Sequence, residues 1–362
     1  MREVSSESPL QVLPRDFYRG RKSAYKVLML TAILIIGSFS VLTVSGRLDV
    51  WAVLGPHVQR SEWAFTMTGA RELNGLGLTG NGINVCVVDS GIDALHPDFA
   101  HARILAWHDF VSSGPEPYDD SGHGTHMASI IAASGSLRGI APNAGLIIAK
   151  VVRADGTGNS SDVAAGIQFC LDPWGDGRGG ADIISLSLGS KAPLFVETKV
   201  TNAVSFAVSR GVIVVAAAGN DGILDDGDVE LAAAVPLAIA VGAVDADSHR
   251  ALFSSIGMSA NRTDPNLKPE VAAPGVRIIT SSPGAHYITV TGTSPATAIV
   301  AGILALILEA RPTLRPSGTS QNVVLIKEAL AQGAKKVPGQ FLPHDPWYGY
   351  GIIDGPATLA AL

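Results

Sequence analysis

The sequence has 362 residues, a length that fits one large domain or two ordinary ones. Hydrophobic residues make up 47 % and charged residues only 16 %, with a mean hydropathy of +0.29, which excludes a disordered chain. The net charge of −6 argues against nucleic-acid binding through a general basic surface, and two cysteines are too few for a disulfide scaffold.

The first predicted element is a transmembrane helix or signal anchor over residues 27–46. These 20 residues contain no charge and are long enough to cross the hydrocarbon core of a membrane as a helix. Only Arg47 follows the segment closely, whereas several basic residues precede it: Arg15, Arg19, Arg21, Lys22 and Lys26. The positive-inside rule therefore predicts residues 1–26 as a cytoplasmic basic stub and the remainder of the chain outside the membrane. Residues 47–67 are predicted to be a juxtamembrane linker.

A cleaved signal peptide, which would make the protein secreted, is the alternative to this anchor. The apolar region of a signal peptide is shorter, however, and Val44-Ser45-Gly46 is a poor cleavage site.

The anchor also divides the charge of the chain. Residues 1–26 carry six basic and three acidic residues, which leaves 20 basic and 29 acidic residues, a net charge of −9, for the part expected outside.

Residues 68–362 are predicted to form one α/β domain with a mostly parallel sheet. Continuous apolar runs, typical of strands buried on both faces, alternate with helical patterns. The runs cover residues 83–88, 146–152, 183–188, 212–218 and 238–244. The predicted helices cover residues 126–133, 162–171, 199–209 and 295–310. The last helix contains an apolar run of 14 residues (295–308), which is short for a membrane span, so we expect it to be buried in the domain.

Three short motifs carry the residue types that nucleophilic catalysis needs. Asp89-Ser90-Gly91 closes a predicted strand, while His123-Gly124-Thr125 and Gly292-Thr293-Ser294 each open a helix. A serine hydroxyl is a weak nucleophile until a base takes its proton, and the base needs a carboxylate to orient it. Ser294, with Pro295 at the first helical position, would direct its amide at a developing oxyanion, and Asn220 after the run at 212–218 supplies a second donor.

With Asp89, His123 and Ser294 in this chain order, the sequence resembles the subtilisin-like serine proteases, or subtilases. The resemblance extends from about residue 68 to Tyr350-Gly351-Ile352-Ile353-Asp354. Further matching motifs are Thr79-Gly80-Asn81-Gly82, His96-Pro97-Asp98, Gly139-Ile140-Ala141-Pro142, Ser187-Leu188-Gly189, Ala218-Gly219-Asn220 and Ala273-Pro274-Gly275. The resemblance implies a three-layer fold in which helices flank the central sheet.

The resemblance also implies a role for each matching residue. Ser294 attacks the scissile carbonyl, His123 transfers the proton, and Asp89 fixes the imidazole tautomer. Asn220 and the amide of Ser294 form the oxyanion hole. The residues that match the family's substrate-binding segments, which hold the peptide backbone as an added strand, are Gly156, Thr157, Gly158, Ser187, Leu188 and Gly189.

Other conspicuous residues have plainer explanations. The motif Gly75-x-Gly77-x-x-Gly80 matches a dinucleotide-binding fingerprint, but it precedes a strand instead of following one, so we expect a turn. His126 lacks further ligands for a metal site and is expected to be structural. Cys86 in a buried strand and Cys170 in a helix are expected to be buried thiols.

Two acidic loops are either solvated or bind Ca²⁺, whose sites need several oxygen ligands. One contains Asp221, Asp225, Asp226, Asp228 and Glu230, and the other Asp172, Asp176 and Asp182. The loop that binds calcium in many subtilases is short here (134–138) and lacks Asn or Asp, so that site is not carried over, although Asp98 resembles one of its ligands. We expect no metal-binding residues and no required cofactor, with Ca²⁺ possible only outside the usual family loop.

The segment before the domain and the serine helix also depart from the family pattern. Ala298 stands where the family often has Pro, which should alter helix packing and not the nucleophile.

Only 41 residues separate Arg47 from Asp89, too few for the folding-chaperone domain that secreted members commonly carry. We therefore expect the enzyme to fold without such a domain or with a partner. Trp51 and Trp63 either rest at the membrane interface or pack on the domain.

These observations predict a membrane-anchored serine endopeptidase that acts on peptide or protein substrates outside the cytoplasmic membrane and binds no nucleic acid. The alternative is a catalytically silent peptide-binding module on the same fold. The His-Gly-Thr-His motif argues against a third candidate, an acid-active relative with a Glu base.

Overall fold

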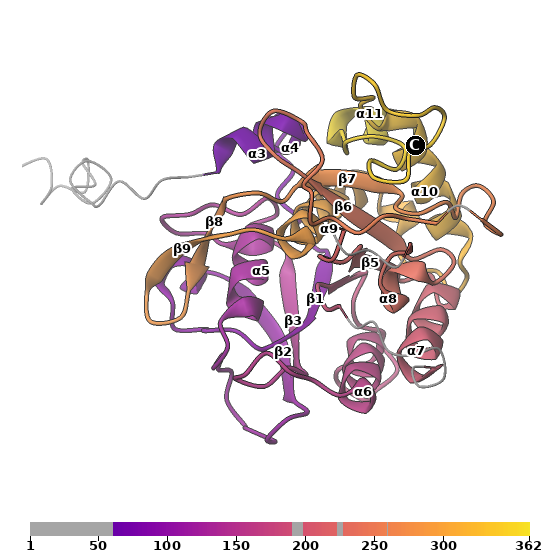
Figure 1. Ribbon diagram of the computed structural model, residues 1–362. Coiled ribbons are helices and arrows are strands. Elements are labelled where there is room, and N and C mark those ends of the chain that lie inside the picture. Colours follow the sequence, from indigo (N-terminus) through magenta and orange to yellow (C-terminus); the bar gives the residue numbers. More distant parts are fainter. Residues whose placement is uncertain (1–60, 190–197, 223–226, 259) are drawn as a thin grey trace, which may run out of the picture. The chain divides into compact units, whose positions relative to one another are not determined.

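The computed structural model describes residues 61–189, 198–222, 227–258 and 260–362 (Figure 1). The predicted basic stub (1–26), the predicted membrane helix (27–46) and the predicted linker as far as residue 60 lie outside the described residues. The chain divides into two units, Met1–His57 and Val58–Leu362, and the fold described here is that of the second.

A parallel sheet of seven strands forms the centre of this unit (Figure 1). The strand order is β2-β3-β1-β4-β5-β6-β7, and each neighbouring pair is parallel. The strands are β1 (Asn84–Asp89), β2 (Arg103–Asp109), β3 (Gly145–Lys150), β4 (Ile183–Leu186), β5 (Ile213–Ala217), β6 (Ile239–Val244) and β7 (Val271–Pro274). The five predicted apolar runs correspond to β1 and β3–β6, which are buried almost throughout. This confirms the predicted α/β fold with a mostly parallel central sheet.

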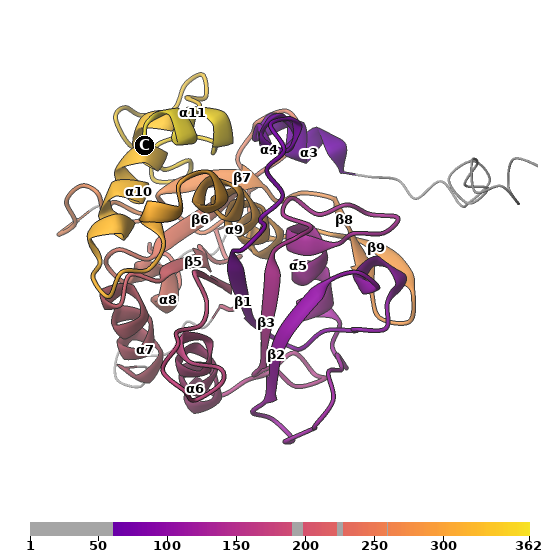
Figure 2. The same cartoon turned by 180° about the vertical axis from the view of Figure 1, so that it is seen from behind.

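Helices cover both faces of the sheet (Figures 1 and 2). On one face α5 (His123–Ala132) packs against α9 (Thr293–Ala310), and on the other α6 (Ser160–Leu171) packs against α7 (Thr198–Ser209). These are the four predicted helices, and each begins one to three residues earlier than predicted. Their first turns are polar or contain glycine, so the hydrophobic periodicity starts only after the helix does.

Helix α9 is the central element of the core. Of its 18 residues, all those from Thr293 to Leu308 are buried. Within the described ranges it is the one helix with the length and hydropathy of a membrane span, and 89 % of that window is buried inside the protein. Its hydrophobicity is therefore explained by burial in the domain, as predicted for residues 295–308.

Shorter elements complete the unit. They are α3 (Glu62–Met67), α4 (Ala70–Gly75), η1 (Pro97–Phe99), α8 (Leu231–Ala234), η2 (Pro312–Leu314), α10 (Gln321–Gly333), α11 (Gly355–Ala360) and the antiparallel hairpin of β8 (Ile278–Ser282) with β9 (His286–Val290). Ala64 and Phe65 of α3 are buried, and Trp63 packs against the core. Packing of the domain therefore begins before residue 68, within the segment expected to be a linker.

Cys86 and Cys170 form a disulfide, which corrects the prediction of two buried thiols. Cys86 lies in β1, and Cys170 lies in α6, which packs against β1. Their Cα atoms are 5.8 Å apart although 84 positions separate the two residues in the sequence. The pairing depends on which helix covers β1, and that information is not present in local sequence patterns.

The disulfide should contribute strongly to stability, because it closes a long loop in the unfolded chain. For a sequence separation of 84, the chain-entropy relation gives about 4.5 kcal/mol. We expect the variant Cys86→Ala/Cys170→Ala to unfold at a clearly lower guanidinium concentration than the oxidised protein. In the denatured, unreduced protein, iodoacetamide should modify no thiol by mass spectrometry, and after reduction it should modify two. Two modified thiols before reduction would contradict the pairing.

Candidate active site

Asp89 and His123 meet where strand β1 ends and helix α5 begins. Nδ1 of His123 lies 2.8 and 2.9 Å from the two carboxylate oxygens of Asp89. The side chain of Asp89 is 1 % exposed, whereas that of His123 is 37 % exposed. A carboxylate facing Nδ1 requires the proton to be on that nitrogen, which leaves Nε2 of the neutral ring as the basic atom.

A second carboxylate, Asp119, secures the start of α5. It accepts hydrogen bonds from the amide of Thr125 at 2.8 Å and from Oγ of Ser90 at 2.8 Å. Oγ of Ser90 in turn accepts from the amide of Gly124 at 2.8 Å. Ser90 directly follows the strand-end aspartate, so this network ties the end of β1 to the turn that carries His123. Sequence reasoning gave Asp119 no role, although an acidic residue just before a helix start is a recognisable signal.

The charges around His123 favour its protonated form. Burial lowers the pKa of His123, but the charge and hydrogen bond of Asp89 and the charge of Asp119 outweigh it, so the pKa is raised above its ordinary value. The pKa of His126, one turn further along α5, is lowered to about 4 by burial and by the charge of His123. His126 is therefore neutral at pH 7, and its Nε2 lies 3.4 Å from Oγ of Ser282.

Ser294 is the second residue of α9. Its Oγ donates to the carbonyl of Ser187 at 3.2 Å, and Oγ of Ser187 donates to the carbonyl of Ser294 at 3.3 Å. Among the described residues no hydrogen bond joins Ser294 to His123, and such bonds often tighten only when substrate binds. Because α9 begins at Thr293, Pro295 is the third helical residue and not the first. It still falls in the first turn, where amides have no partner within the helix.

Asn220 lies beside the start of α9 and is held there by Thr293. Oδ1 of Asn220 accepts hydrogen bonds from the amide of Thr293 at 2.8 Å and from its Oγ1 at 3.1 Å. An amide N–H can only donate, so the oxygen of Asn220 must face Thr293, and Nδ2 keeps its hydrogens for another acceptor. Sequence reasoning did not assign this orienting role to Thr293, whose only signal is its place directly before Ser294.

Four of the six predicted substrate-binding residues line one cavity of about 110 Å³, whereas Thr157 and Ser187 are not among its lining residues. Gly156 and Gly158 come from a turn after β3 in which the carbonyl of Thr157 accepts a hydrogen bond from the amide of Arg153, and Leu188 and Gly189 come from the segment after β4. The other lining residues are mostly aliphatic: Val152, Val163, Leu186, Val200, Leu231, Ala232, Asn159 and Ser160. A concave apolar cavity with backbone polar groups at its rim is suited to an apolar side chain of a ligand.

Carboxylates of the two acidic loops form contacts within the protein. The pairs are Asp228 with Arg262, Asp221 with Ser255, Asp182 with Arg315, Asp176 with Arg178, and Asp172 with the amides of Asp176 and Gly177. Asp225 and Asp226 lie outside the described residues. Asp98 is buried and accepts from Oγ of Ser281 at 2.7 Å. Protein donors therefore hold these carboxylates in place.

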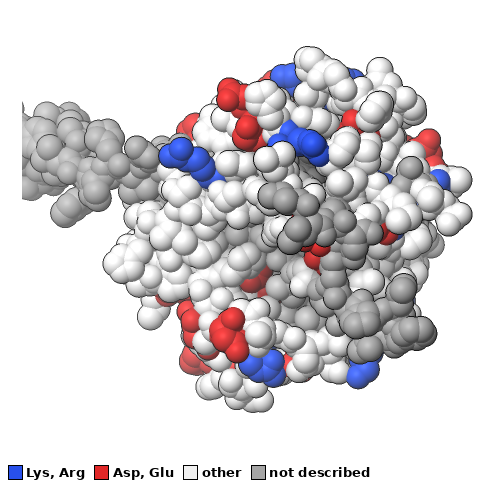
Figure 3. Space-filling model, viewed as in Figure 1, with Lys and Arg blue, Asp and Glu red and all other residues white. Residues whose placement is uncertain are grey.

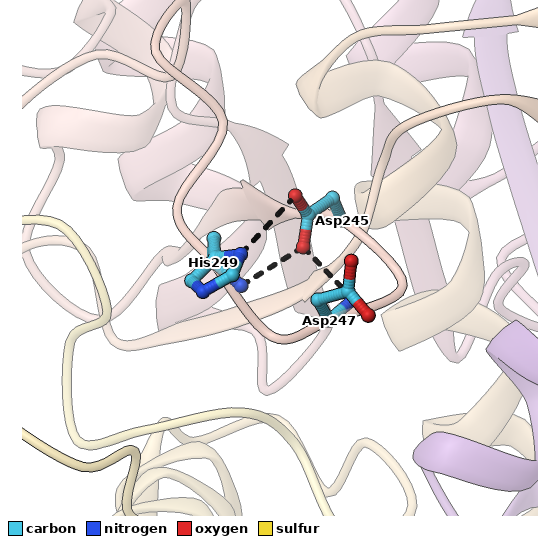
Figure 4. Close-up of side chains that lie close together, drawn as sticks. All are labelled: Asp245, Asp247 and His249. Carbon is cyan, nitrogen blue, oxygen red and sulfur yellow. Dashed lines mark hydrogen bonds and ion pairs between the residues drawn. The ribbon is translucent and has the colours of Figure 1, made fainter.

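Asp245, Asp247 and His249 come together in the turn after β6 (Figure 4). Oδ1 of Asp245 accepts from the amides of Asp247 and His249, each at 2.9 Å. Nδ1 of His249 lies 3.7 Å from the other carboxylate oxygen. These contacts are typical of a turn that begins with aspartate, so the cluster is explained by the turn itself.

The motif Gly75-x-Gly77-x-x-Gly80 begins at the last residue of α4 and continues into the connection to β1, where a turn was predicted. Gly77 and Gly80 have positive φ angles of 89° and 82°. The amides of Thr79 and Gly80 donate to Oε2 of Glu309 in α9, both at 2.6 Å. These amides, which a nucleotide phosphate would need as hydrogen-bond donors, are therefore already bonded to a carboxylate of the protein.

Residues 80–351 match the model of the subtilase family. The chain belongs to the subtilase family. It is 38 % identical over 303 residues to an alkaline protease of Alkalihalobacillus alcalophilus, a match that covers 83 % of this chain and 70 % of the relative. It is also 38 % identical to subtilisin Savinase of Lederbergia lenta, over 83 % of this chain and 99 % of the relative. Serine protease AprX of Bacillus subtilis (strain 168) is 38 % identical over 78 % of this chain and 67 % of the relative.

The family and these relatives identify the subtilase as a serine endopeptidase, a hydrolase whose substrates are peptides or proteins. The predicted enzyme class is thereby confirmed.

Proposed function

We propose that this subtilase cleaves peptide bonds with Asp89, His123 and Ser294 as a catalytic triad and with Asn220 in the oxyanion hole. The observation that carries the proposal is the hydrogen-bonded pair of Asp89 and His123 at the start of α5. That helix packs against α9, whose first turn carries Ser294. A base oriented by a buried carboxylate and a serine at a helix N-terminus are what acyl transfer requires.

In the proposed reaction, the Ser294 hydroxyl first turns from the carbonyl of Ser187 toward Nε2 of His123. Nε2 takes its proton as Oγ bonds to the scissile carbonyl carbon, and Asp89 stabilises the imidazolium that forms. The imidazolium gives this proton to the leaving amine as the C–N bond breaks. Water then repeats the sequence in place of Ser294 and releases the acyl group.

The negative charge that develops on the carbonyl oxygen is stabilised by Nδ2 of Asn220 and the amide of Ser294. Thr293 fixes the amide oxygen of Asn220, so the donor is oriented before substrate arrives. Preorganised donors of this kind are typically worth about 10²–10³ in kcat each. We propose that this reaction requires no cofactor.

The substrate is proposed to lie between the turn at Gly156, Thr157 and Gly158 and the segment at Ser187, Leu188 and Gly189. Both segments border the apolar cavity, and glycines let the substrate backbone approach closely. An apolar side chain of the substrate would enter the cavity while its backbone pairs with the two segments. Ser187 contacts Ser294, so the second segment leads directly to the nucleophile.

The domain is proposed to act outside the cytoplasmic membrane, anchored by residues 27–46. The apolar segment and its basic flank support the anchor. The disulfide between Cys86 and Cys170 is independent support for the compartment, because disulfides persist in oxidising environments and are rare in the cytosol. Secretion after cleavage of a signal peptide is the alternative.

Replacing the nucleophile should abolish both turnover and covalent labelling. For Ser294→Ala we expect kcat on a casein-derived peptide to fall by about 10⁶-fold and labelling by a fluorophosphonate probe to disappear. Ser317→Ala, an exposed serine, is the matched control and should keep both. Undiminished labelling of Ser294→Ala would contradict the triad. A folded wild-type protein that shows neither turnover nor labelling would favour the silent peptide-binding module.

Removing the charge of Asp119 should move the acid limb of the pH–activity profile to lower pH. His123 accepts a proton only when neutral, so kcat/KM falls as the pH drops through its pKa, which the charge of Asp119 helps to raise. Asp119→Asn lowers that pKa, and the limb shifts with it. Glu72→Gln, on the exposed side of α4, should leave the limb in place. An upward shift for Asp119→Asn would refute this role.

The location is tested on the full-length chain. We expect the protein to remain in membranes washed with alkaline carbonate and to retain residues 1–26 by mass spectrometry. A membrane-impermeant fluorophosphonate should label it on intact cells. A soluble protein whose N-terminus follows residue 46 would establish the cleaved signal peptide instead.

A further inference from the structure

Lys150, the last residue of β3, is a buried charge that the proposed mechanism does not use. Figure 3 shows Lys and Arg side chains at the surface of the protein, which is their usual place, whereas the side chain of Lys150 is 0 % exposed. Strand β3 pairs with β1, and Lys150 stands in register with Asp89. A buried ammonium group is costly unless hydrogen bonds and an opposite charge compensate for it, so the contacts of Lys150 indicate its role.

The ammonium group of Lys150 binds acceptors from three separate segments. Nζ donates to the carbonyl of Ser90 at 2.7 Å, to the carbonyl of Val152 at 2.8 Å and to Oδ1 of Asp120 at 2.6 Å. An ammonium group has three hydrogens, so these contacts use all of its donors. The carboxylate of Asp120 supplies the compensating charge. Lys150 is therefore held in one position and in turn fixes the three segments to one another.

Two of these acceptors belong to the segments that place the proposed catalytic pair. Ser90 directly follows Asp89, and its Oγ donates to Asp119 at 2.8 Å. Asp120 directly follows Asp119, whose carboxylate secures the start of the helix that carries His123. The ammonium group thus contacts both chain segments on which the geometry of the pair depends.

The third acceptor, Val152, lies at the base of the proposed substrate-binding turn. Val152 forms a β-bridge with Gly158, and the amide of Arg153 donates to the carbonyl of Thr157 at 2.8 Å. Val152 also lines the apolar cavity. Lys150 therefore joins the base of the turn that would hold the peptide backbone to the strand end that carries the catalytic pair.

The backbone alone fixes this junction only in part. The amides of Val151 and Val152 donate to the carbonyl of Asp89 at 2.8 and 3.2 Å, which keeps the two strand ends side by side. The carbonyls of Ser90 and Val152 both face the ammonium group. Without it, each would lose a donor in a buried setting, so we expect the segments to move apart or to admit water.

We propose that Lys150 is a positioning residue that holds the substrate-binding turn after β3 in a fixed place relative to Asp89 and His123. The inference rests on the proposed function, which assigns the turn to peptide binding and the pair to catalysis. An extended peptide that pairs with the turn depends on this alignment. A small ester that acylates Ser294 without reaching the turn does not depend on it.

The test compares two substrates on full-length Lys150→Met in detergent. Methionine keeps an apolar side chain at this position and lacks the ammonium group. The substrates are an extended peptide p-nitroanilide and p-nitrophenyl acetate, and rates are expressed per site labelled by a fluorophosphonate, so unfolded protein is not counted. We expect kcat/KM for the peptide to fall about 30-fold or more, with KM raised and kcat lowered, and kcat/KM for the ester to fall about threefold or less.

Lys327→Met is the matched control, because it removes an ammonium group that is also 0 % exposed. Lys327 belongs to α10, which carries none of the proposed site residues, and its Nζ contacts Glu270 at 2.7 Å and Asn266 at 2.8 Å. This variant should lower stability in guanidinium and leave the ratio of peptide to ester rates unchanged. A purely structural role for Lys150 would make the two variants behave alike.

Lys150→Arg retains the charge and the donors on a longer side chain and should recover part of the peptide rate. Equal losses on the two substrates in Lys150→Met, or the same change of ratio in Lys327→Met, would overturn the proposal. If Lys150→Met does not fold, Lys150→Arg decides the question. Its displaced donors should still lower the peptide rate more than the ester rate, and an unchanged ratio would then refute the positioning role.

The same measurements separate this outcome from failure of the proposed function. A wild-type protein that hydrolyses both substrates and is labelled at Ser294, while Lys150→Met loses both rates equally, retains the triad and lacks the positioning role. A wild-type protein that is neither labelled nor active refutes the proposed function, and the role of Lys150 in that function fails with it.

Discussion

The constraint on which this structure depends is the burial of a parallel sheet on both faces. Strands β1 and β3–β6 have almost no exposed residues, so polar groups are excluded until each strand ends. Because the strands are parallel, their carboxyl ends meet at one edge. Asp89 ends β1, Ser187 follows β4 and Asn220 follows β5. The polar side chains of the candidate site lie at that edge because the strands themselves are buried on both faces.

Helix N-termini provide the second half of the site. Helix α5 begins with His123 and α9 with Thr293 and Ser294, and the two helices pack together on one face of the sheet. Each start is fastened to a strand end by side-chain hydrogen bonds, through Asp119 and Ser90 for α5 and through Asn220 for α9. The same contacts that satisfy the first-turn amides also position the groups proposed to react. Stability of the helix starts and geometry of the site are therefore coupled.

Two further features lie near the candidate active site. The disulfide joins β1, three residues before Asp89, to α6 on the opposite face from α9. The buried side chain of Glu230 lies between Gly189 and Gly219. The first bears on the compartment in which the domain is stable. Neither changes the groups proposed to carry out the reaction.

The sequence by itself determined the α/β class, five strands that are buried almost throughout and the four main helices, because continuous apolar runs and helical periodicity are local patterns. It also singled out Asp89, His123, Asn220 and Ser294, since each lies at an element's end with a recognisable neighbourhood. Short or amphipathic elements such as β7 and β2 carry weaker patterns and were not predicted. Only the tertiary structure decided the pairing of Cys86 with Cys170, the orienting contact of Thr293 with Asn220 and the position of Glu230 between two glycines. Each of these joins segments distant in sequence, and their proximity follows from how helices and loops pack on the sheet.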